Sequence, residues 1–179
     1  MSARRQVGVV LSAVAILGGI AWLLIRSAPP RVEVGFAAPD FRVVNVATGK
    51  TVTRSTEYRG AVTLVNIWGT WCGPCRQEMP AMDSLYRALA GRGFRIAAVS
   101  YNEKSLDDVR KFVSDHQLAF DVLNDATDQI TSDFQTTGAP ESFLLDRTGH
   151  IVRIMIGAAP WNSPENHRII EQLLATPGS

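Results

Sequence analysis

The stretch that decides the fold is residues 62–75, which read VTLVNIWGTWCGPC. Its first half, Val62 to Trp68, is an apolar, β-rich run of the kind that forms a strand buried on both faces. Pro74 follows at a position that suits the first turn of a helix, where the missing backbone N–H of proline costs nothing. The stretch therefore predicts a central strand, a short turn that carries two cysteines, and a helix.

Strands and helices alternate along the rest of the chain, which is typical of an α/β fold built from crossovers. The 179 residues suit one domain plus a short appendage, and a composition that is 46% apolar and 20% charged excludes a disordered polyelectrolyte. The expected elements are a hairpin at 41–46 and 51–53, a helix at 74–91 kinked at Pro80, a strand at 94–100, a helix opening at Ser105, a strand and a helix within 120–136, a hairpin at 142–146 and 150–156, and a helix from Ser163 to Leu174.

Residues 7–25 form an uncharged apolar run of 19 residues, VGVVLSAVAILGGIAWLLI. As a helix this run would span about 28 Å, close to the roughly 30 Å core of a bilayer. Arg4 and Arg5 precede the run and Trp22 lies near its end, so we expect an N-terminal transmembrane anchor with residues 1–6 in the cytoplasm. A cleavable signal peptide is the competing interpretation, but the exit LLIRSAPP has no A-x-A-like cleavage site.

Residues 26–35 are rich in proline and predict a stiff linker, after which one domain should cover residues 36–176. The formal net charge of the whole chain is +1. Four arginines flank the apolar run at positions 4, 5, 26 and 31, so the remainder of the chain carries a net charge of −3. No basic stripe remains for nucleic acid, and we expect no nucleic-acid partner.

The two cysteines, Cys72 and Cys75, fall where the predicted strand gives way to the predicted helix. Backbone N–H groups at a helix N-terminus stabilise a thiolate, so the pKa of Cys72 should lie below the usual value of about 8.5. Cys75, one helical turn later, is placed to resolve a mixed disulfide formed by Cys72. Three alternatives remain open here: a purely structural disulfide, a zinc site that would need two further ligands, and chance.

The segment WGTWCGPCRQEMP at 68–80 resembles the active-site segment of the thioredoxin superfamily, and more narrowly of the membrane-anchored TlpA/ResA and DsbE (CcmG) reductases. A second segment, GAPESFLLD at 138–146, is similar to a DsbE motif. The resemblance covers roughly residues 35–174. It implies a thioredoxin-like fold, a central mixed sheet flanked by helices, in which Pro140 is a cis-proline facing the disulfide and the backbone of Ala139 pairs with a bound substrate strand.

Further site candidates follow from the same two segments. Glu78 shares a helix face with Cys75, so it is placed to take up or return a proton; the alternative is a solvated surface carboxylate. Glu141 matches the acid after the family's proline, although an exposed Glu at a strand edge needs no function. The predicted catalytic residues are therefore Cys72, Cys75 and Glu78. The predicted substrate contacts are Trp71, Gly73, Pro74, Ala139, Pro140 and Glu141.

Two features of the sequence depart from the patterns of the families that the chain resembles. Asn66 stands where general thioredoxins carry a buried aspartate, which argues against a proton relay through that position. The dipeptide Gly73-Pro74 is that of thioredoxin rather than the usual DsbE dipeptide, which leaves the redox potential and the subfamily open.

The resemblance implies a thiol-disulfide reductase on the extracytoplasmic or periplasmic side of a bacterial cytoplasmic membrane. Its substrates would be disulfides of exported proteins, with apocytochrome c as the first candidate, and its electrons would come from a membrane donor of the DsbD or CcdA type. We expect no metal or organic cofactor beyond the cysteine pair. The alternatives are an oxidase of the DsbA kind, a peroxidase, which is disfavoured because its chemistry does not require the second cysteine, and a non-catalytic binding module with a structural disulfide.

Overall fold

The structure is a computed structural model that describes residues 16–20, 22 and 31–177. The chain divides into two compact units, Met1–Arg31 and Val32–Ser179. In the first unit the described residues 16–20 and 22 are helical. Over the described residues we find no helix with the length and apolar character needed to cross a bilayer. Most of the anchor predicted at 7–25 lies outside the described residues.

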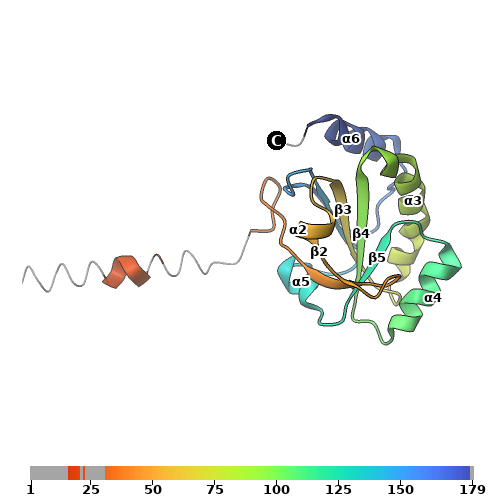
Figure 1. The fold of residues 1–179 in the computed structure, drawn as a ribbon, viewed down its shortest axis with the longest axis horizontal. Coiled ribbons are helices and arrows are strands. Elements are labelled where there is room, and N and C mark those ends of the chain that lie inside the picture. Colours follow the sequence, from red (N-terminus) through yellow and green to blue (C-terminus); the bar gives the residue numbers. More distant parts are fainter. Residues whose placement is uncertain (1–15, 21, 23–30, 178–179) are drawn as a thin grey trace, which may run out of the picture. The chain divides into compact units, whose positions relative to one another are not determined.

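The second unit is built on one seven-stranded mixed sheet in the order β2-β1-β5-β4-β3-β6-β7 (Figure 1). Strand β4 pairs in parallel with β3 and β5, and the remaining pairs are antiparallel. The central parallel strands are joined by crossovers, as the alternating pattern predicted. The strands are β1 (Arg42–Asn45), β2 (Thr51–Thr53), β3 (Val62–Trp68), β4 (Phe94–Tyr101), β5 (Asp121–Asp125), β6 (Glu141–Leu145) and β7 (Ile151–Ile156).

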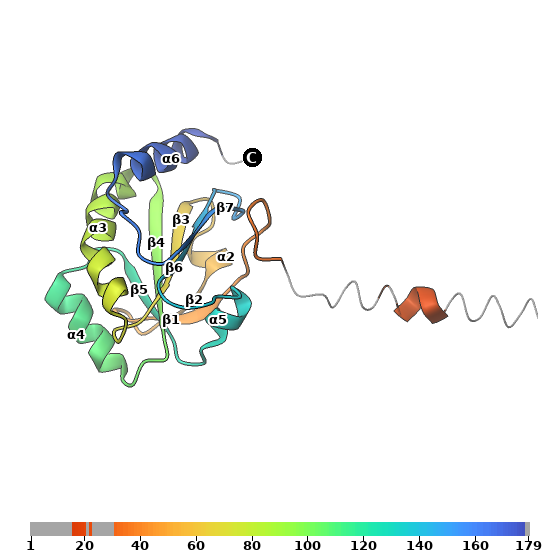
Figure 2. The ribbon, with the colours of Figure 1, turned by 180° about the vertical axis from the view of Figure 1, so that it is seen from behind.

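Helices cover both faces of this sheet, with α3, α4 and α6 on one face and α2 and α5 on the other (Figures 1 and 2). The helices are α2 (Arg54–Glu57), α3 (Gly73–Leu89), α4 (Leu106–His116), α5 (Gln129–Asp133) and α6 (Pro164–Ala175), with a 3-10 turn at Ala90–Arg92. Ser105 and Ser163 cap α4 and α6 with their side-chain oxygens, as the sequence predicted. Pro80 lies inside α3, which continues to Leu89.

Strand β3 connects the two hydrophobic cores because its side chains alternate between the faces of the sheet. Leu64 and Trp68 pack into the core under α3, α4 and α6. Val65 and Ile67 pack into the core on the other face. Every residue of the strand is buried, as expected for a strand covered on both sides.

Two isoleucines on strands test how much of the stability comes from this burial. Ile96 in β4 is fully buried, whereas Ile156 at the end of β7 is 74% exposed. We expect Ile96→Ala to lower the free energy of unfolding by about 2–5 kcal/mol, since it removes transfer energy and leaves a cavity. Ile156→Ala should change it by less than about 0.5 kcal/mol. Urea unfolding of the two variants checks this, and equal losses would contradict the core assignment.

Candidate active site

The two cysteines lie where β3 gives way to α3, and they form a disulfide. Cys72 is the N-cap of α3, and the backbone N–H of Cys75 donates a hydrogen bond to its sulfur at 3.2 Å. Pro74 occupies the first turn of the helix, as predicted. The local sequence thus places the first cysteine at a helix N-terminus, where backbone N–H groups face its sulfur and favour a negative charge on it.

The two sulfur-bearing residues differ in access to solvent. Cys72 keeps a relative exposure of 5%, whereas Cys75 has none. Trp71 lies beside them with half of its surface exposed. Its ring meets the ring of Tyr101 edge-on at 5.5 Å, and its Nε1 donates to the Tyr101 carbonyl at 3.3 Å. A partner approaching the disulfide would therefore meet Trp71 and Cys72 before Cys75.

A second segment, residues 137–141, faces the disulfide from the start of β6. The peptide bond between Ala139 and Pro140 is cis, as the family resemblance implied. The carbonyl oxygen of Ala139 lies 3.5 Å from the sulfur of Cys72, and the Pro140 carbonyl accepts from the Gly157 N–H at 2.8 Å. The structure therefore brings Ala139 and Pro140 next to the cysteine pair, although 64 residues or more separate them in the sequence.

Glu78 is buried beneath the cysteine turn, with a relative exposure of 4%. One carboxylate oxygen accepts hydrogen bonds from the Ala159 N–H at 3.0 Å and the Trp161 Nε1 at 3.1 Å. The other oxygen accepts from the Asn66 Nδ2 at 2.9 Å. The interpretation of Glu78 as a solvated surface carboxylate is therefore wrong. The loop before α6 covers the face of α3 that carries Glu78, and the sequence pattern does not predict this cover.

Burial raises the pKa of Glu78 above its ordinary value of 4.5, and the three hydrogen bonds to the carboxylate oppose part of that rise. Glu78 lies one turn after Cys75 on the same helix. Within the described residues, however, its hydrogen bonds go to Asn66, Ala159 and Trp161 and not to either cysteine. The acid is thus held near the sulfur pair with a raised affinity for a proton.

Asn66 links this acid to the sheet. Its Nδ2 donates both to Glu78 and to the Ser142 hydroxyl, at 2.9 and 2.8 Å. Its Oδ1 is buried and has no hydrogen-bond partner within the described part of the chain. An unpaired buried carbonyl beside a protonatable acid provides an acceptor that a neutral Glu78 can use after the amide rotates.

Glu141 lies on the opposite face of the sheet from Glu78. It pairs in register with Ile67, whose side chain belongs to the core away from α3, and residues paired across antiparallel strands point to the same face. Its side chain accepts from the Thr137 N–H at 3.0 Å, and burial raises its pKa. With a relative exposure of 5%, Glu141 is buried, so the interpretation of an exposed residue at a strand edge is wrong. Its hydrogen bond with the Thr137 N–H stabilises the turn at 137–141.

Sequence reasoning missed three contributors to the site: Ala159, Trp161 and Glu103. The first two complete the hydrogen bonds of Glu78 from the loop between β7 and α6. The carboxylate of Glu103, just after β4, accepts from the Thr70 N–H at 2.7 Å and from its hydroxyl at 2.5 Å. This contact fixes the turn that carries Trp71 and Cys72. No local pattern in the sequence signals any of the three.

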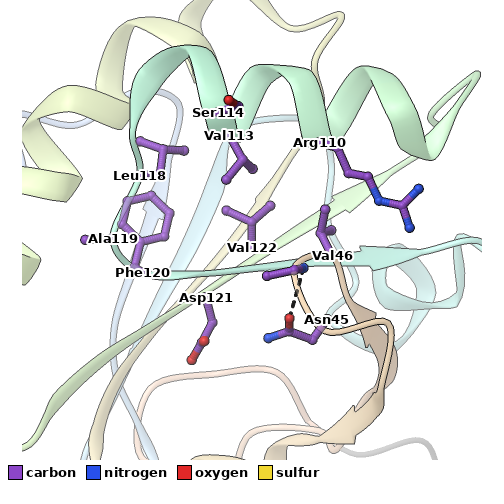
Figure 3. A pocket seen from close by; sticks show the side chains of 11 residues that line it. Asn45, Val46, Arg110, Val113, Ser114, Leu118, Ala119, Phe120, Asp121 and Val122 are labelled. Carbon is purple, nitrogen blue, oxygen red and sulfur yellow. Dashed lines mark hydrogen bonds between the residues drawn. The ribbon is translucent and has the colours of Figure 1, made fainter.

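The apolar hollow beneath α4 does not contain the predicted site residues. A hollow of about 320 Å³ lies beneath α4 where β5 begins, lined largely by apolar side chains such as Val113, Leu118 and Phe120 (Figure 3). Asn45 at its edge accepts a hydrogen bond from the Ala47 N–H at 3.1 Å. None of the predicted site residues lines it. Across the described residues, no three His, Cys, Asp or Glu side chains are grouped to hold a metal ion.

Comparison with known proteins agrees with this geometry. Residues 34–154 match the model of the AhpC/TSA family. The chain is 35% identical over 136 residues to thiol-disulfide oxidoreductase ResA of Geobacillus kaustophilus, covering 76% of each chain. It is 33% identical over 147 residues to the thioredoxin-like protein YneN of Bacillus subtilis, covering 79% of this chain and 84% of that protein.

A solved structure extends the likeness to three dimensions. The crystal structure of a putative thiol:disulfide interchange protein DsbE from Chlorobium tepidum aligns with a TM-score of 0.68 and 29% identity. The alignment covers 80% of this chain and 96% of that one. The domain that carries the cysteine pair is thus matched along nearly the whole length of the neighbour.

The buried acid makes stability depend on pH in a defined direction. Because the folded pKa of Glu78 is raised, the folded chain keeps this proton in a window above 4.5 in which the unfolded chain has lost it. The wild-type free energy of unfolding should therefore fall, relative to that of Glu78→Gln, as pH rises through this window. Urea unfolding from about pH 4 to about pH 8 measures the difference between the two proteins.

Glu33→Gln, at an exposed carboxylate, is the matched control and should follow the wild-type pH dependence. Glu78→Gln keeps the side-chain size, and its amide can pair with the free Asn66 Oδ1. If the difference in the free energy of unfolding between Glu78→Gln and wild type does not change with pH across this range, the result would contradict a raised pKa at Glu78.

Proposed function

We propose that this chain, which belongs to the AhpC/TSA family, is a thiol-disulfide oxidoreductase that reduces disulfides of exported proteins. The observation that carries the proposal is the disulfide at the N-terminus of α3, whose outer member Cys72 lies against the cis-proline turn and beside the exposed Trp71. The relatives include a thiol-disulfide oxidoreductase and a putative thiol:disulfide interchange protein, which supports the same reaction class.

The proposed reaction is a two-step exchange. In the reduced protein the Cys72 thiolate attacks one sulfur of a substrate disulfide, forming a mixed disulfide and releasing the other substrate sulfur as a thiolate. Cys75 then attacks the sulfur of Cys72 and expels the first substrate sulfur. Two electrons pass from the protein dithiol to the substrate, and the Cys72–Cys75 disulfide seen in the structure is the oxidised product.

The surroundings supply charge stabilisation and proton handling. The Cys75 N–H already points at the Cys72 sulfur, so a negative charge there requires no rearrangement. We assign to Glu78 the role of accepting the proton that Cys75 must lose before it can attack. Burial raises the pKa of Glu78, and α3 places it one helical turn after Cys75. Gly73 and Pro74 fit the tight start of the helix.

Substrate recognition is assigned to the rim around Cys72. Trp71 offers an exposed aromatic face, and Ala139 and Pro140 present backbone beside the sulfur, where a substrate strand can pair. Glu141 is assigned an indirect role, because its carboxylate is buried and holds the Thr137 N–H rather than facing solvent. It shapes the turn that meets the substrate.

The proposed location is the outer face of a bacterial cytoplasmic membrane. The apolar run at 7–25 would anchor the chain, and the domain would lie on the extracytoplasmic or periplasmic side. A dithiol can remain reduced in such an oxidising compartment only if electrons reach it, so the proposal includes a membrane donor of the DsbD or CcdA type. Apocytochrome c is the first substrate to test.

A trapping variant tests the mechanism directly. In Cys75→Ser the resolving thiol is missing, so mixed disulfides with substrates should accumulate through Cys72 in the native membrane. Non-reducing electrophoresis detects them, and dithiothreitol should release them. The matched control Cys72→Ser should trap far less, because Cys75 has no exposed surface.

The outcomes of this trap separate the parts of the proposal. Adducts that contain apocytochrome c would support a role in cytochrome c maturation, and adducts with other exported proteins would support general reduction. Equal trapping by the two cysteine variants would contradict the assignment of Cys72 as the attacking thiol. A lack of adducts in both would favour a structural disulfide.

The direction of exchange is predicted by the redox potential. The Gly73-Pro74 dipeptide between the cysteines is that of thioredoxin, whose potential is about −270 mV, whereas the oxidant DsbA has about −120 mV. We expect the potential of the full chain, equilibrated with dithiothreitol or glutathione couples and read by thiol alkylation, to fall near the thioredoxin end. A value near that of DsbA would overturn the reductase in favour of an oxidase.

A further inference from the structure

A second hollow in the domain is lined by basic and hydroxyl side chains rather than apolar ones. It measures about 430 Å³ and lies between α2 and the turn that joins β6 to β7. No Asp or Glu lines it. The polar side chains that form its wall are Arg54, Arg59, Arg147, Ser55, Thr56 and Thr148.

Two of the three arginines are held in place by backbone carbonyls. Arg54 donates from Nε to the Pro39 carbonyl at 3.0 Å. Arg147 donates to the carbonyls of Gly60 and Leu174 at 2.9 and 3.1 Å. Both side chains are half-buried, so their guanidinium groups are fixed at the wall of the hollow before any ligand arrives.

No carboxylate of the described residues forms an ion pair with the three arginines of the hollow, although the charge of Arg54 helps to lower the pKa of the nearby Asp40. The ion pairs of the described residues, all within 4 Å, involve other cations, and none includes Arg54, Arg59 or Arg147. Two acids lie close in the chain, and their carboxylate oxygens accept hydrogen bonds from groups other than the three arginines. Asp40 accepts from Ser55 and from the Phe41 N–H. Asp146 accepts from the backbone and hydroxyl of Thr148 and from the His150 N–H.

Three guanidinium groups at the wall of one hollow match the chemistry of a phosphate group. Guanidinium presents N–H donors in a fork that fits phosphate oxygens. The hydroxyls of Ser55 and Thr148 already donate to Asp40 and Asp146, so the arginines supply the donors for the ligand. The rest of the domain carries excess negative charge, so this positive site is not a general property of the surface. We infer that the hollow binds a phosphate-bearing ligand.

The hollow lies at the end of β3 opposite to the cysteines. It lies beside Gly60, which precedes β3, whereas the cysteines follow the other end of β3, so the ligand does not meet the reacting sulfurs. The chain that leads into the domain borders the hollow, because the Ala38 N–H donates to the Gly149 carbonyl at 2.9 Å and Pro39 accepts from Arg54. A phospholipid headgroup and a free phosphate share the required chemistry.

Thermal unfolding of the full chain in a non-ionic detergent tests the site. Inorganic phosphate, exchanged for chloride at constant ionic strength, should raise the unfolding midpoint in a saturable way, since a ligand bound only to the folded state stabilises it. Arg59 is exposed, so Arg59→Glu leaves the fold intact while reversing one charge of the site. We expect it to weaken the apparent affinity at least about tenfold, and Arg59→Lys to retain most of the affinity.

A matched control separates the site from a general effect of phosphate or of charge. Arg110→Glu makes the same change of charge at an exposed position on α4, outside the hollow, and should respond to phosphate as the wild type does. Phosphate also stabilises proteins without binding them, so an equal midpoint shift in wild type and Arg59→Glu would overturn the inference.

A second arm distinguishes the two sources. Phosphatidylglycerol dispersed in the micelles, compared with phosphatidylcholine, presents the phosphodiester of a lipid headgroup. A stabilisation by phosphatidylglycerol that Arg59→Glu loses would identify a lipid headgroup, and one confined to inorganic phosphate would identify a soluble anion. No Arg59-dependent shift with either probe would overturn the site, while leaving the redox function untouched.

Discussion

The burial of β3 on both faces is the constraint on which the rest of the structure depends. Because the strand is pleated, Leu64 and Trp68 must face one core while Val65 and Ile67 face the other. The one amide in the strand, Asn66, is forced by the same alternation onto the face covered by α3. The strand therefore fixes the start of the cysteine helix and places a polar group beneath it.

A polar side chain in that position needs partners, and the partners bind distant segments together. Asn66 bridges Ser142 of β6 and Glu78 of α3, and Glu78 in turn receives N–H groups from the loop before α6. Buried polar groups are costly unless paired, so each of these contacts restrains the helix that presents Cys72. The Oδ1 of Asn66, which has no hydrogen-bond partner within the described residues, leaves this network one acceptor that a neutral Glu78 could use.

The sequence was most informative where structure is set by neighbours in the chain. The strand at 62–68, the turn with Cys72 and the caps at Ser105 and Ser163 all follow from patterns a few residues long. The surroundings of Glu78 could not be predicted in this way, because its donor Trp161 is 83 residues away and a surface acid and a buried one share the same helical spacing. The hollow lined by Arg54, Arg59 and Arg147 could not be predicted either, because the fold brings Arg147 to two arginines that are far from it in the sequence. The net negative charge of the domain gives no sign of such a positive hollow.

The cysteine pair and the hollow lined by arginines lie at opposite ends of β3. Seven residues at about 3.3 Å each place the cysteine turn roughly 20 Å from Gly60 and the arginines. The chain also enters the domain at the arginine end, through the contact between Ala38 and Gly149. The phosphate proposed for the hollow and the contact of Ala38 would therefore both lie at the side of the domain away from Cys72. A ligand in the hollow would then leave the Cys72 sulfur open to a substrate disulfide, so binding at one end of β3 and exchange at the other need not compete.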